Sequence, residues 1–418
     1  MPQNSGPPAR AAFSYPNFRF YMTARFLTVA STEMQAVAVA WQIYGLTHRP
    51  LDLGLVGLAQ FAPGIFLFLF AGKTADQYPR QRIIQSCYTG FSLCSVLLLS
   101  LALHGLAVVW PIYAVLIANG VVRAFNGPAG QAFLPLLVSE EHFPNAVTWS
   151  SSIFQSAVVL GPTLGGLIYG LTSSPVPVYC CAAAGYLTAM LLVSMIRLQF
   201  VARARGASSA LVLEGLQYIW RNKLVLGSIS LDLFAVLLGG AVALLPVYAR
   251  DILNAGAYGL GVLRSAPALG AVLMAIALAY RPLRRRAGIT LLCCVFGFGT
   301  FTVIFGISRS MAVSLVALAL IGACDMVSVI VRHTLVQLAT PDAMRGRVSA
   351  VNTLFIGASN EVGQFESGIT AQWFGTVPAV VLGGLGTIAI VLLWARMFPA
   401  LRKVDQLVPA QAAVSRTP

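Results

Sequence analysis

Residues 72–82, "GKTADQYPRQR", interrupt two long apolar stretches of the chain. Before them stands "GLVGLAQFAPGIFLFLFA" (54–71), and after them stands "IIQSCYTGFSLCSVLLLSLAL" (83–103). Each stretch has about 20 residues, the length that an α-helix needs to cross the hydrocarbon core of a bilayer. The short charged segment therefore predicts a turn between two membrane-spanning helices.

The composition of the whole chain agrees with a membrane protein. Of its 418 residues, 58% are hydrophobic and only 10% are charged, whereas soluble domains carry about 25% charged residues. The apolar runs are continuous and do not alternate with polar residues, so they indicate helices and not the strands of a barrel. We expect an all-α protein with many membrane spans.

The net charge of +14 raises the question of a nucleic-acid partner. The cations lie between apolar segments, where the positive-inside rule places them, and no basic stretch is interleaved with stacking aromatics. The seven cysteines lie in apolar segments without metal-ligand spacing. No Ser-His-Asp set or phosphate-binding glycine loop stands out. We therefore expect no nucleic acid, no metal, no cofactor and no enzymatic activity.

Twelve apolar segments follow one another along the chain. Their bounds are 20–46, 53–72, 83–104, 108–128, 147–171, 176–196, 224–249, 258–280, 288–307, 311–331, 348–374 and 377–397. The longest connection contains "RARGASSA" and "LEGLQYIWRNK", which predict a flexible linker and a short amphipathic helix at the membrane surface. The predicted organisation is a six-helix bundle at 1–200, the cytoplasmic linker with its surface helix at 201–223, a second six-helix bundle at 224–400 and a cytoplasmic tail at 401–418.

The distribution of basic residues predicts the orientation of the spans. If both termini are cytoplasmic, all but four of the 27 Lys and Arg fall in cytoplasmic regions or at cytoplasmic span ends. The four exceptions are Arg49, Arg250, Arg264 and Arg309. Since short cytoplasmic loops are enriched in Lys and Arg, this asymmetry predicts that both termini are cytoplasmic.

The two halves of the chain are related. "GLAQFAPGIFLFLFAGKTADQYPRQR" aligns with "GVLRSAPALGAVLMAIALAYRPLRRR" at an offset of 204, which pairs Gly57 with Gly261 and Pro63 with Pro267. "LVSEEHFPNAV" aligns with "LATPDAMRGRV" at an offset of 201. Two nearly equal offsets indicate a six-plus-six duplication. Parallel halves with a site at their interface are typical of secondary transporters.

The residues of segment 72–82 have predicted roles in the turn. Gly72 would let neighbouring backbones approach closely at a helix end, and Asp76 would cap a helix or pair with a cation. Arg80 and Arg82 would keep the turn in the cytoplasm. A turn of this kind can act as a conformational latch, or it can serve only to orient the spans.

Three motifs resemble those of the major facilitator superfamily. "GKTADQYPRQR" resembles its signature loop, G-x-x-x-D-[RK]-x-G-[RK]-x-[RK]; the four residues just named match, while Gln77 replaces a cation and Pro79 a glycine. "RAFNG" (123–127) resembles the Arg-x-x-x-Gly motif of the fourth span. "GPTLGG" (161–166) resembles the span-five motif of exporters.

Other segments resemble one branch of that superfamily. "VAWQIYGLT" (39–47), "RPLRRRAG" (281–288) and "PDAMRGRVSAVNTLFIGASNEVGQFESG" (341–368) look like the branch that contains the enterobactin exporter and macrolide efflux pumps. The resemblance covers about residues 15–400. It implies two parallel six-helix bundles, export of drug-like or siderophore-like molecules, a bacterial inner membrane and a monomer.

Ionisable residues inside the spans are the candidate site residues, because they are costly in a membrane. Glu33 shares a helical face with Trp41 and can bind a proton or a cationic aromatic substrate. Asn119, Arg123 and Asn126 form a polar stripe. An arginine cannot release its proton, but the resemblance implies that Arg123 assists proton coupling at a nearby carboxylate. A structural ion pair between Glu33 and Arg123 is the alternative.

Further carboxylates lie in the second half of the chain. Glu361 and Glu366 are on different sides of the eleventh span, so at least one should face a cavity or a partner helix. Asp232 and Asp325 lie in the seventh and tenth spans. A structural pair with a nearby cation, such as Asp325 with Arg332, and a role in transport both remain open.

The glycines of "GPTLGG" predict close helix packing. Gly161 and Gly165, like Gly166 and Gly170, are four residues apart, the spacing of small residues at helix contacts in membranes. Pro162 removes a backbone donor and favours a bend. A role of this motif in export is implied by the resemblance alone.

These observations lead to one hypothesis and two alternatives. We expect a secondary exporter of small organic molecules that works by alternating access and proton antiport, with Glu33 as the first proton carrier to test and Glu366 as the second. The expected partners are the substrate, protons and the lipid bilayer. A lysophospholipid flippase of the same fold is the first alternative. A membrane receptor that transports nothing is the second, disfavoured because no soluble signalling domain is evident.

Overall fold

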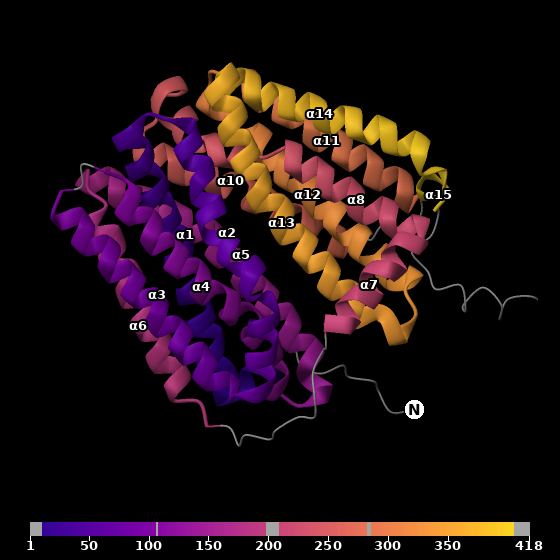
Figure 1. Ribbon diagram of the computed structural model, residues 1–418, viewed down its shortest axis with the longest axis horizontal. Helices are drawn as coiled ribbons and strands as arrows, with labels where there is room; N and C mark the ends of the chain where they lie inside the picture. The colour runs from indigo at the N-terminus through magenta and orange to yellow at the C-terminus, as the bar shows by residue number, and fades with distance from the viewer. Residues whose placement is uncertain (1–10, 106–107, 198–208, 282–285, 405–418) are drawn as a thin grey trace, which may run out of the picture. The chain divides into compact units, whose positions relative to one another are not determined.

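The computed structural model describes residues 11–105, 108–197, 209–281 and 286–404. Within these ranges the chain forms helices and turns and contains no strand (Figure 1). The all-α prediction is confirmed.

Six long helices form the first half of the chain. They are α1 (Pro16–Thr47), α2 (Pro50–Gln77), α3 (Arg80–Leu103), α4 (Trp110–Phe133), α5 (Phe143–Thr172) and α6 (Val176–Ser194). Three short 3₁₀ turns accompany them: η1 (Ala11–Ser14), η2 (Leu134–Leu136) and η3 (Glu140–His142). Each of the first six predicted segments is covered by one of the long helices.

The second half begins with a short surface helix and continues with longer ones. Its elements are α7 (Ser209–Arg221), α8 (Lys223–Leu238), η4 (Ala241–Leu244), α9 (Leu245–Val247), η5 (Tyr248–Ile252), α10 (Gly256–Tyr280), α11 (Ala287–Ile307), α12 (Met311–Ala339), α13 (Asp342–Phe374), α14 (Thr376–Met397) and α15 (Pro399–Arg402). Helices again overlap each predicted segment.

The seventh predicted segment, 224–249, is not the continuous helix that its apolar run predicts. α8 ends at Leu238, and a 3₁₀ turn, one turn of α-helix and a π-helical turn follow. Gly240 lies at the break, where a Cβ atom would stand 2.6 Å from the carbonyl oxygen of Gly363 in α13. The break therefore permits a close backbone contact that a side chain would prevent. Broken helices of this kind are found at transport sites.

Hydropathy separates the helices into two groups. In the described part of the chain, nine helical stretches are long and apolar enough to cross a membrane. α1, α4 and α13 are not among them. These three helices contain the predicted site residues Glu33, Arg123, Glu361 and Glu366. The predicted site residues with ionisable side chains thus lie in the three less apolar helices.

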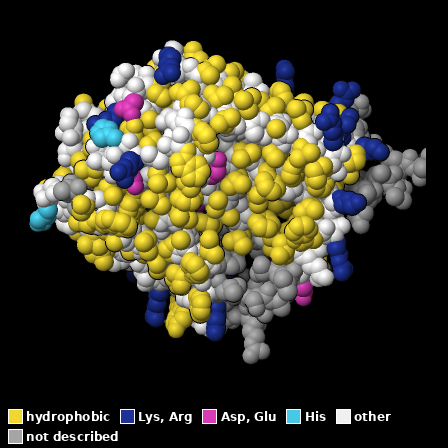
Figure 2. Space-filling model, turned by 45° about the horizontal axis from the view of Figure 1, so that its top comes forward, with side chains coloured by type: hydrophobic (Ala, Val, Ile, Leu, Met, Phe, Trp, Pro, Cys, Tyr) yellow, Lys and Arg dark blue, Asp and Glu magenta, His cyan; other side chains and the backbone are white. Residues whose placement is uncertain are grey.

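The surface is apolar, as a lipid-facing surface must be. Large apolar side chains are widely exposed, among them Phe66 (77%), Trp110 (75%) and Leu171 (77%). On the face drawn in Figure 2, hydrophobic side chains cover most of the surface and charged ones are few. Extended apolar surface of this kind marks contact with a membrane or a partner.

The chain divides into two compact units. Unit 1 consists of Met1–His48, Ala59–Gly206 and Gly256–Ser265, and unit 2 consists of Arg49–Leu58, Ala207–Ala255 and Ala266–Pro418. The start of α10 thus belongs to unit 1, and the start of α2 belongs to unit 2. The units therefore follow the two halves of the sequence except for these two exchanged segments.

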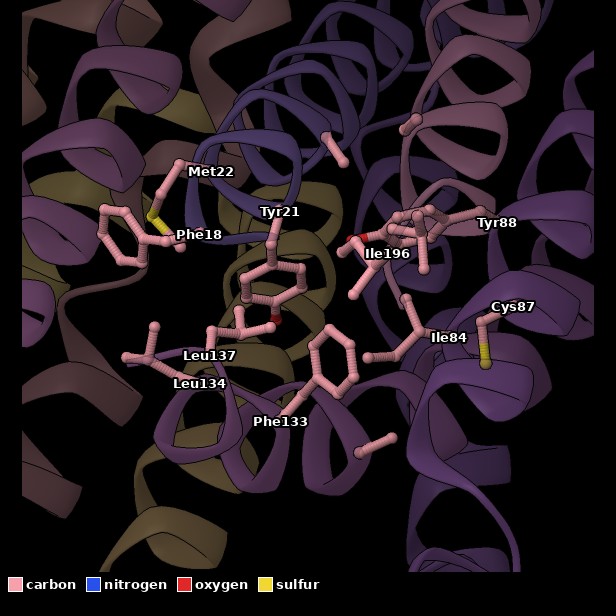
Figure 3. Packing of buried hydrophobic residues seen from close by; sticks show 14 of the residues in the cluster. Phe18, Tyr21, Met22, Ile84, Cys87, Tyr88, Phe133, Leu134, Leu137 and Ile196 are labelled. Atoms are coloured by element: carbon pink, nitrogen blue, oxygen red, sulfur yellow. The ribbon is translucent and has the colours of Figure 1, made fainter. Parts of the chain in front are cut away.

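Aromatic and aliphatic side chains pack together in the core of unit 1 (Figure 3). The ring of Tyr21 meets that of Phe133 edge to face at 5.0 Å, and its hydroxyl donates to the carbonyl oxygen of Gly130 at 3.2 Å. Phe18 and Ile84 are fully buried in the same cluster. Because a buried tyrosine needs a partner for its hydroxyl, this contact ties α1 to α4.

Glycines hold α5 against α1 in unit 1. A Cβ atom on Gly161 would stand 2.7 Å from the Cβ atom of Glu33, and one on Gly165 would stand 2.8 Å from the Cα atom of Met34. The spacing of four residues places both glycines on the face of α5 that meets α1, as the repeat predicts.

The next glycine of the motif holds the start of α10. A Cβ atom on Gly166 would lie 2.7 Å from the Cα atom of Gly261. In unit 2 the start of α2 meets α13 in the same way, since a Cβ atom on Gly57 would lie 3.1 Å from the Oε2 atom of Glu361. Gly57 and Gly261 are partners in the sequence repeat, and each lies at a close helix crossing of an exchanged segment.

The surface helix α7 packs on unit 2. Glu214 forms an ion pair with Arg347 of α13, and the Tyr218 hydroxyl donates to the carbonyl oxygen of Ala339 at 2.6 Å. Ile219 is buried, whereas Trp220 is 66% exposed. One face of α7 therefore holds the bundle and the other is free for the membrane interface, where tryptophan is favoured.

These glycine contacts lead to a first prediction. Gly165→Ala should lower the Tm of the detergent-solubilised protein, because the new methyl group would meet the backbone of α1. Overpacking of this kind costs about 1–3 kcal/mol. The matched control is Gly127→Ala in α4, where a Cβ atom would meet nothing within 4 Å. The control should leave the Tm unchanged or raise it, since alanine favours a helix over glycine by about 1 kcal/mol. Equal Tm values for both variants would contradict the packing argument.

Candidate transport site

The first candidate site follows the seam between α1 and α5 in unit 1. At successive contacts the residue numbers increase in the same direction along α1 and α5, so the two helices run parallel. Three contacts define the α1–α5 seam: the Arg25 guanidinium over the ring of Phe154 (5.7 Å), Glu33 beside Gly161, and the rings of Trp41 and Tyr169 edge to face (6.4 Å). A cation, a carboxylate and an aromatic pair thus follow one another, a set able to bind an amphipathic molecule.

Glu33, the first predicted proton carrier, forms an ion pair with Arg264. The Arg264 Nε atom lies 3.6 Å from the Glu33 Oε2 atom, and the side chains are 26% and 25% exposed. Arg264 stands on the part of α10 that belongs to unit 1. The ion pair therefore connects α1 to α10, with about a quarter of each side chain accessible. At 3.6 Å this contact is longer than a close charge-assisted hydrogen bond.

Hydroxyl groups support this ion pair from the neighbouring turn. The Ser265 Oγ atom lies 2.7 Å from the Thr163 Oγ1 atom and 2.8 Å from the Val159 carbonyl oxygen. Thr163 is part of the "GPTLGG" motif, between the glycines that touch α1 and α10. The motif therefore packs α5 against both partners of the Glu33–Arg264 ion pair.

The predicted polar stripe of α4 is unevenly exposed. Asn119 is buried (8% exposed), Asn126 is half-buried and Arg123 is exposed. A Cβ atom on Gly120, beside Asn119, would lie 2.4 Å from the carbonyl oxygen of Gln60 in α2. The stripe thus begins in a helix contact and continues to an open face. The role of Arg123 in proton coupling stays a prediction.

The two carboxylates of α13 have different surroundings in unit 2. Glu361 is buried, accepts a hydrogen bond from Gln364 Nε2 (3.1 Å) and faces Gly57 of α2. Glu366 is half-buried and accepts a hydrogen bond from the Thr370 hydroxyl (2.7 Å). Glu361 therefore faces a partner helix, while Glu366 has a partner one turn along its own helix.

The segment 72–82 is mostly helical. α2 continues to Gln77, and α3 begins at Arg80. The Arg80 Nη1 atom donates to the carbonyl oxygen of Ala132 at 2.7 Å, near the end of α4, where the backbone carbonyls carry a partial negative charge. Arg82 is exposed, and its backbone amide donates to the Pro79 carbonyl oxygen. Arg80 thus holds the turn to α4.

The two other latch residues have less support. A Cβ atom on Gly72 would meet nothing within 4 Å, so the close backbone approach expected there is not found in the described part of the chain. The side chain of Asp76 lies outside the described residues. The latch function stays a prediction.

Sequence reasoning missed two arginines of this region. Arg264 was counted only as one of four exceptions to the positive-inside rule, and such an exception within a span is the signal that pointed to it. Arg25 was counted among the cytoplasmic cations, although it lies within the first predicted segment. Its Nε atom is buried without a hydrogen-bond partner among the described residues.

Comparison with known proteins places the chain in a family. Residues 8–415 match the transmembrane secretion effector family of the major facilitator superfamily. The chain belongs to this family. The enterobactin exporter EntS of Escherichia coli (strain SMS-3-5 / SECEC) is 26% identical over 405 residues, which are 96% of each chain. The enterobactin exporter EntS of Shigella boydii serotype 4 (strain Sb227) is 27% identical over 407 residues, with the same coverage.

Solved structures support the fold alone, since their sequence identities are low. The nucleoside transporter NupG aligns with a TM-score of 0.70 at 12% identity, over 91% of this chain and 99% of that one. A bacterial homologue of the human lysosomal transporter Spinster aligns with a TM-score of 0.71 at 14% identity, over 93% and 98%. The major facilitator fold predicted from the sequence is confirmed.

Family membership also decides the general class of activity. The family and the relatives are transporters, so the expectation of a transporter and not an enzyme is confirmed. The protein is a multi-pass protein of the bacterial inner membrane that exports small molecules.

The ion pair at the site gives a second prediction. Glu33→Gln and Arg264→Gln should each lower stability, and the double variant should lose less than the sum of both. The expected coupling is about 0.5–1 kcal/mol, because both side chains are partly exposed. The measurement is a double-mutant cycle of thermal unfolding in detergent. Glu140→Gln, which removes an exposed carboxylate, serves as the control with Arg264→Gln. Additive losses in the Glu33 cycle would contradict the ion pair.

Proposed function

We propose that this protein exports a small organic molecule in exchange for protons by alternating access. The observation that carries the proposal is the Glu33–Arg264 ion pair, which joins a carboxylate in α1 to a cation in α10. α10 begins in unit 1 and ends in unit 2. A change in the charge of Glu33 therefore acts on a helix that both units share.

The proposed coupling step is electrostatic. When Glu33 is ionised, its attraction to Arg264 adds to the Thr163–Ser265 contact and holds the start of α10 on α1 and α5. A proton on Glu33 removes that attraction and leaves the hydroxyl and glycine contacts. The start of α10 can then separate from unit 1. Exchange follows if substrate binding and proton binding oppose each other, because coupling between two ligands is reciprocal.

The α1–α5 seam supports an aromatic substrate with an acidic group. Phe154, Trp41 and Tyr169 offer ring faces or edges. Arg25 offers a buried Nε donor without a hydrogen-bond partner in the described part of the chain, and an anionic group would satisfy it. The relatives named as enterobactin exporters suggest a siderophore and the direction of export.

The other candidate residues have supporting parts in this proposal. Glu366 is the second proton carrier to test, because its carboxylate is half-buried. Arg123, with Asn119 and Asn126, would act on a nearby carboxylate as the protein changes conformation. Glu361 would hold the start of α2 on α13 as Glu33 holds the start of α10.

The cytoplasmic turn completes the proposed cycle. Asp76 with the arginines 80 and 82 would hold the cytoplasmic side in one state and release it in the other. The protein would act as a monomer, as the resemblance to this superfamily implies, with both termini in the cytoplasm, as the distribution of basic residues predicts.

Flux in proteoliposomes tests the proposed function. With an imposed pH gradient, addition of enterobactin or a cationic dye to the wild type should move protons, and Glu33→Gln should lose this movement by at least about tenfold, since one charge-changing group is removed. Glu140→Gln is the matched control and should behave as the wild type. Internal pH and substrate flux are recorded together.

The other outcomes of this experiment decide among the alternatives. If proton movement is retained in Glu33→Gln and lost in Glu366→Gln, the proton carrier is Glu366 of α13 and not Glu33. Lysophospholipid transfer without a gradient, together with no proton movement, would replace antiport by the flippase function.

Cysteine labelling tests the orientation. In intact cells, a membrane-impermeant maleimide should label Arg309→Cys, which is predicted to be periplasmic, and should label Glu140→Cys only after permeabilisation. Both positions are exposed. The background variant replaces Cys180, Cys181 and Cys293, which are exposed in the native chain. The reverse labelling pattern would show that the positive-inside assignment is wrong.

A further inference from the structure

Unit 2 contains a charged cluster that the proposed function does not use. Asp232 of α8 forms an ion pair with Arg332 of α12. The two side chains are only 9% and 2% exposed. The open alternative from the sequence, a structural ion pair in this region, is therefore found, with Asp232 as the partner of Arg332. Asp325 remains as a second carboxylate close by.

Three polar residues lie on one face of α12. Asp325, Ser328 and Arg332 stand at positions i, i+3 and i+7, and such positions share a helical face. Asp325 and Ser328 line a small cavity together with Asp232 and the thiol of Cys324. Its volume is about 10 Å³, the space that one water-sized ligand needs. The cavity lies directly beside the buried ion pair.

One polar atom of this cavity lacks a hydrogen-bond partner. Ser328 is 3% exposed, and its Oγ atom is buried without a hydrogen-bond partner among the described residues. In the adjacent ion pair, the Nε atom of Arg332 is also buried without a hydrogen-bond partner there. Buried polar groups are paired in the great majority of cases. An unpaired hydroxyl that lines a cavity between two carboxylates points to a small polar ligand there.

The charges of the cluster set the sign of that ligand. If both carboxylates are ionised, Asp232, Asp325 and Arg332 sum to one negative charge. Asp232 is compensated by Arg332, so the uncompensated charge falls on Asp325. An uncompensated charge within a membrane-spanning bundle is costly. One positive charge at Asp325 removes this cost.

The other titratable groups near Asp325 do not supply this charge. On α12 they are Cys324 and His333, which follows Arg332 and is exposed, and on α11 it is Cys294. A neutral thiol adds no positive charge, and protonation of His333 is opposed by the neighbouring Arg332. Where α12 packs on α10, Gly322 of α12 faces the backbone of α10 and Gly270 of α10 faces the backbone of α12. No titratable side chain is among these glycine contacts.

We propose that Asp325 is a second proton-binding site, separate from Glu33 and contained within unit 2. The step is the transfer of one proton from a hydronium ion to a carboxylate oxygen of Asp325; one O–H bond of the donor breaks, one O–H bond of the acid forms, and water and a neutral carboxylic acid result. The acid O–H and the Ser328 hydroxyl then share the cavity, while Asp232 stays paired with Arg332. The inference goes beyond the proposed function, because it gives the protein a proton that Glu33 does not carry.

A metal ion fits this cluster poorly. No group of three His, Cys, Asp or Glu side chains that could hold a metal occurs in the part of the chain that the structure describes. The guanidinium of Arg332 also repels a divalent cation from the neighbouring cavity. A monovalent ion such as Na⁺ shares the charge of a proton, so the experiment must separate these two.

Infrared difference spectroscopy tests the proposal without any transported substrate. Full-length protein in lipid nanodiscs is titrated with acid, and the carbonyl stretch of protonated carboxyl groups is followed. The wild type should show one band from a buried carboxylic acid that is absent in Asp325→Asn. Glu33→Gln should retain this band, so failure of the proposed antiport and failure of this site are distinguishable. Asp251→Asn, which removes an exposed carboxyl group of unit 2, is the matched control and should also retain it.

A conservative variant guards against loss of the fold. Asp325→Glu keeps a carboxyl group and should show the band at a shifted frequency or titration midpoint. A band retained in Asp325→Asn would overturn the proposal. A band that disappears on addition of NaCl at constant pH, and not on addition of choline chloride, would also overturn it, because the occupant would then be Na⁺.

Discussion

The close approach of helix backbones at glycines is the constraint on which the rest of this structure depends. In lipid no hydrophobic force drives helices together, so they associate through packing and polar contacts. Gly161 and Gly165 bring α5 onto α1, and Gly166 brings the start of α10 onto α5. Glu33 stands against Gly161, and Arg264 follows Gly261 by one turn. The glycines thus place the carboxylate within reach of its cation.

The duplication of the chain repeats this arrangement with different chemistry. The start of α2 packs on α13 in unit 2, and the start of α10 packs on α5 in unit 1. Repeat-related Gly57 and Gly261 lie at these crossings. A carboxylate stands near each, but Glu361 meets an amide from Gln364, whereas Glu33 meets a guanidinium. A proton on Glu33 ends its attraction to the Arg264 guanidinium, which is why the coupling step is proposed for α1 and α10.

The sequence predicted the helices better than the contacts, for a physical reason. A helix that crosses a bilayer needs about 20 apolar residues, so the helical segments could be predicted from hydropathy. The repeat could be found by aligning the two halves of the sequence. The break after Leu238 was not, because Gly239 and Gly240 lie in an apolar run and only their contact with α13 explains them. The partner of Glu33 was likewise hidden, since Arg264 is distant in sequence. At Gly72 a Cβ atom would meet nothing within 4 Å among the described residues, so the role expected for this glycine stays a prediction.

The two ion pairs differ in burial, and this difference indicates which ion pair should persist and which should break during transport. Breaking a buried ion pair by removing one charge costs about 3–5 kcal/mol, because the other charge stays uncompensated. Asp232 and Arg332 are almost fully buried, so their ion pair should persist through a transport cycle. Glu33 and Arg264 are about a quarter exposed, so their ion pair should break more readily. The buried ion pair keeps one cation beside Asp325, and the more exposed one joins α1 to α10. If both proposed carboxylates bind protons, each unit gains one proton, and only the proton on Glu33 would release a helix.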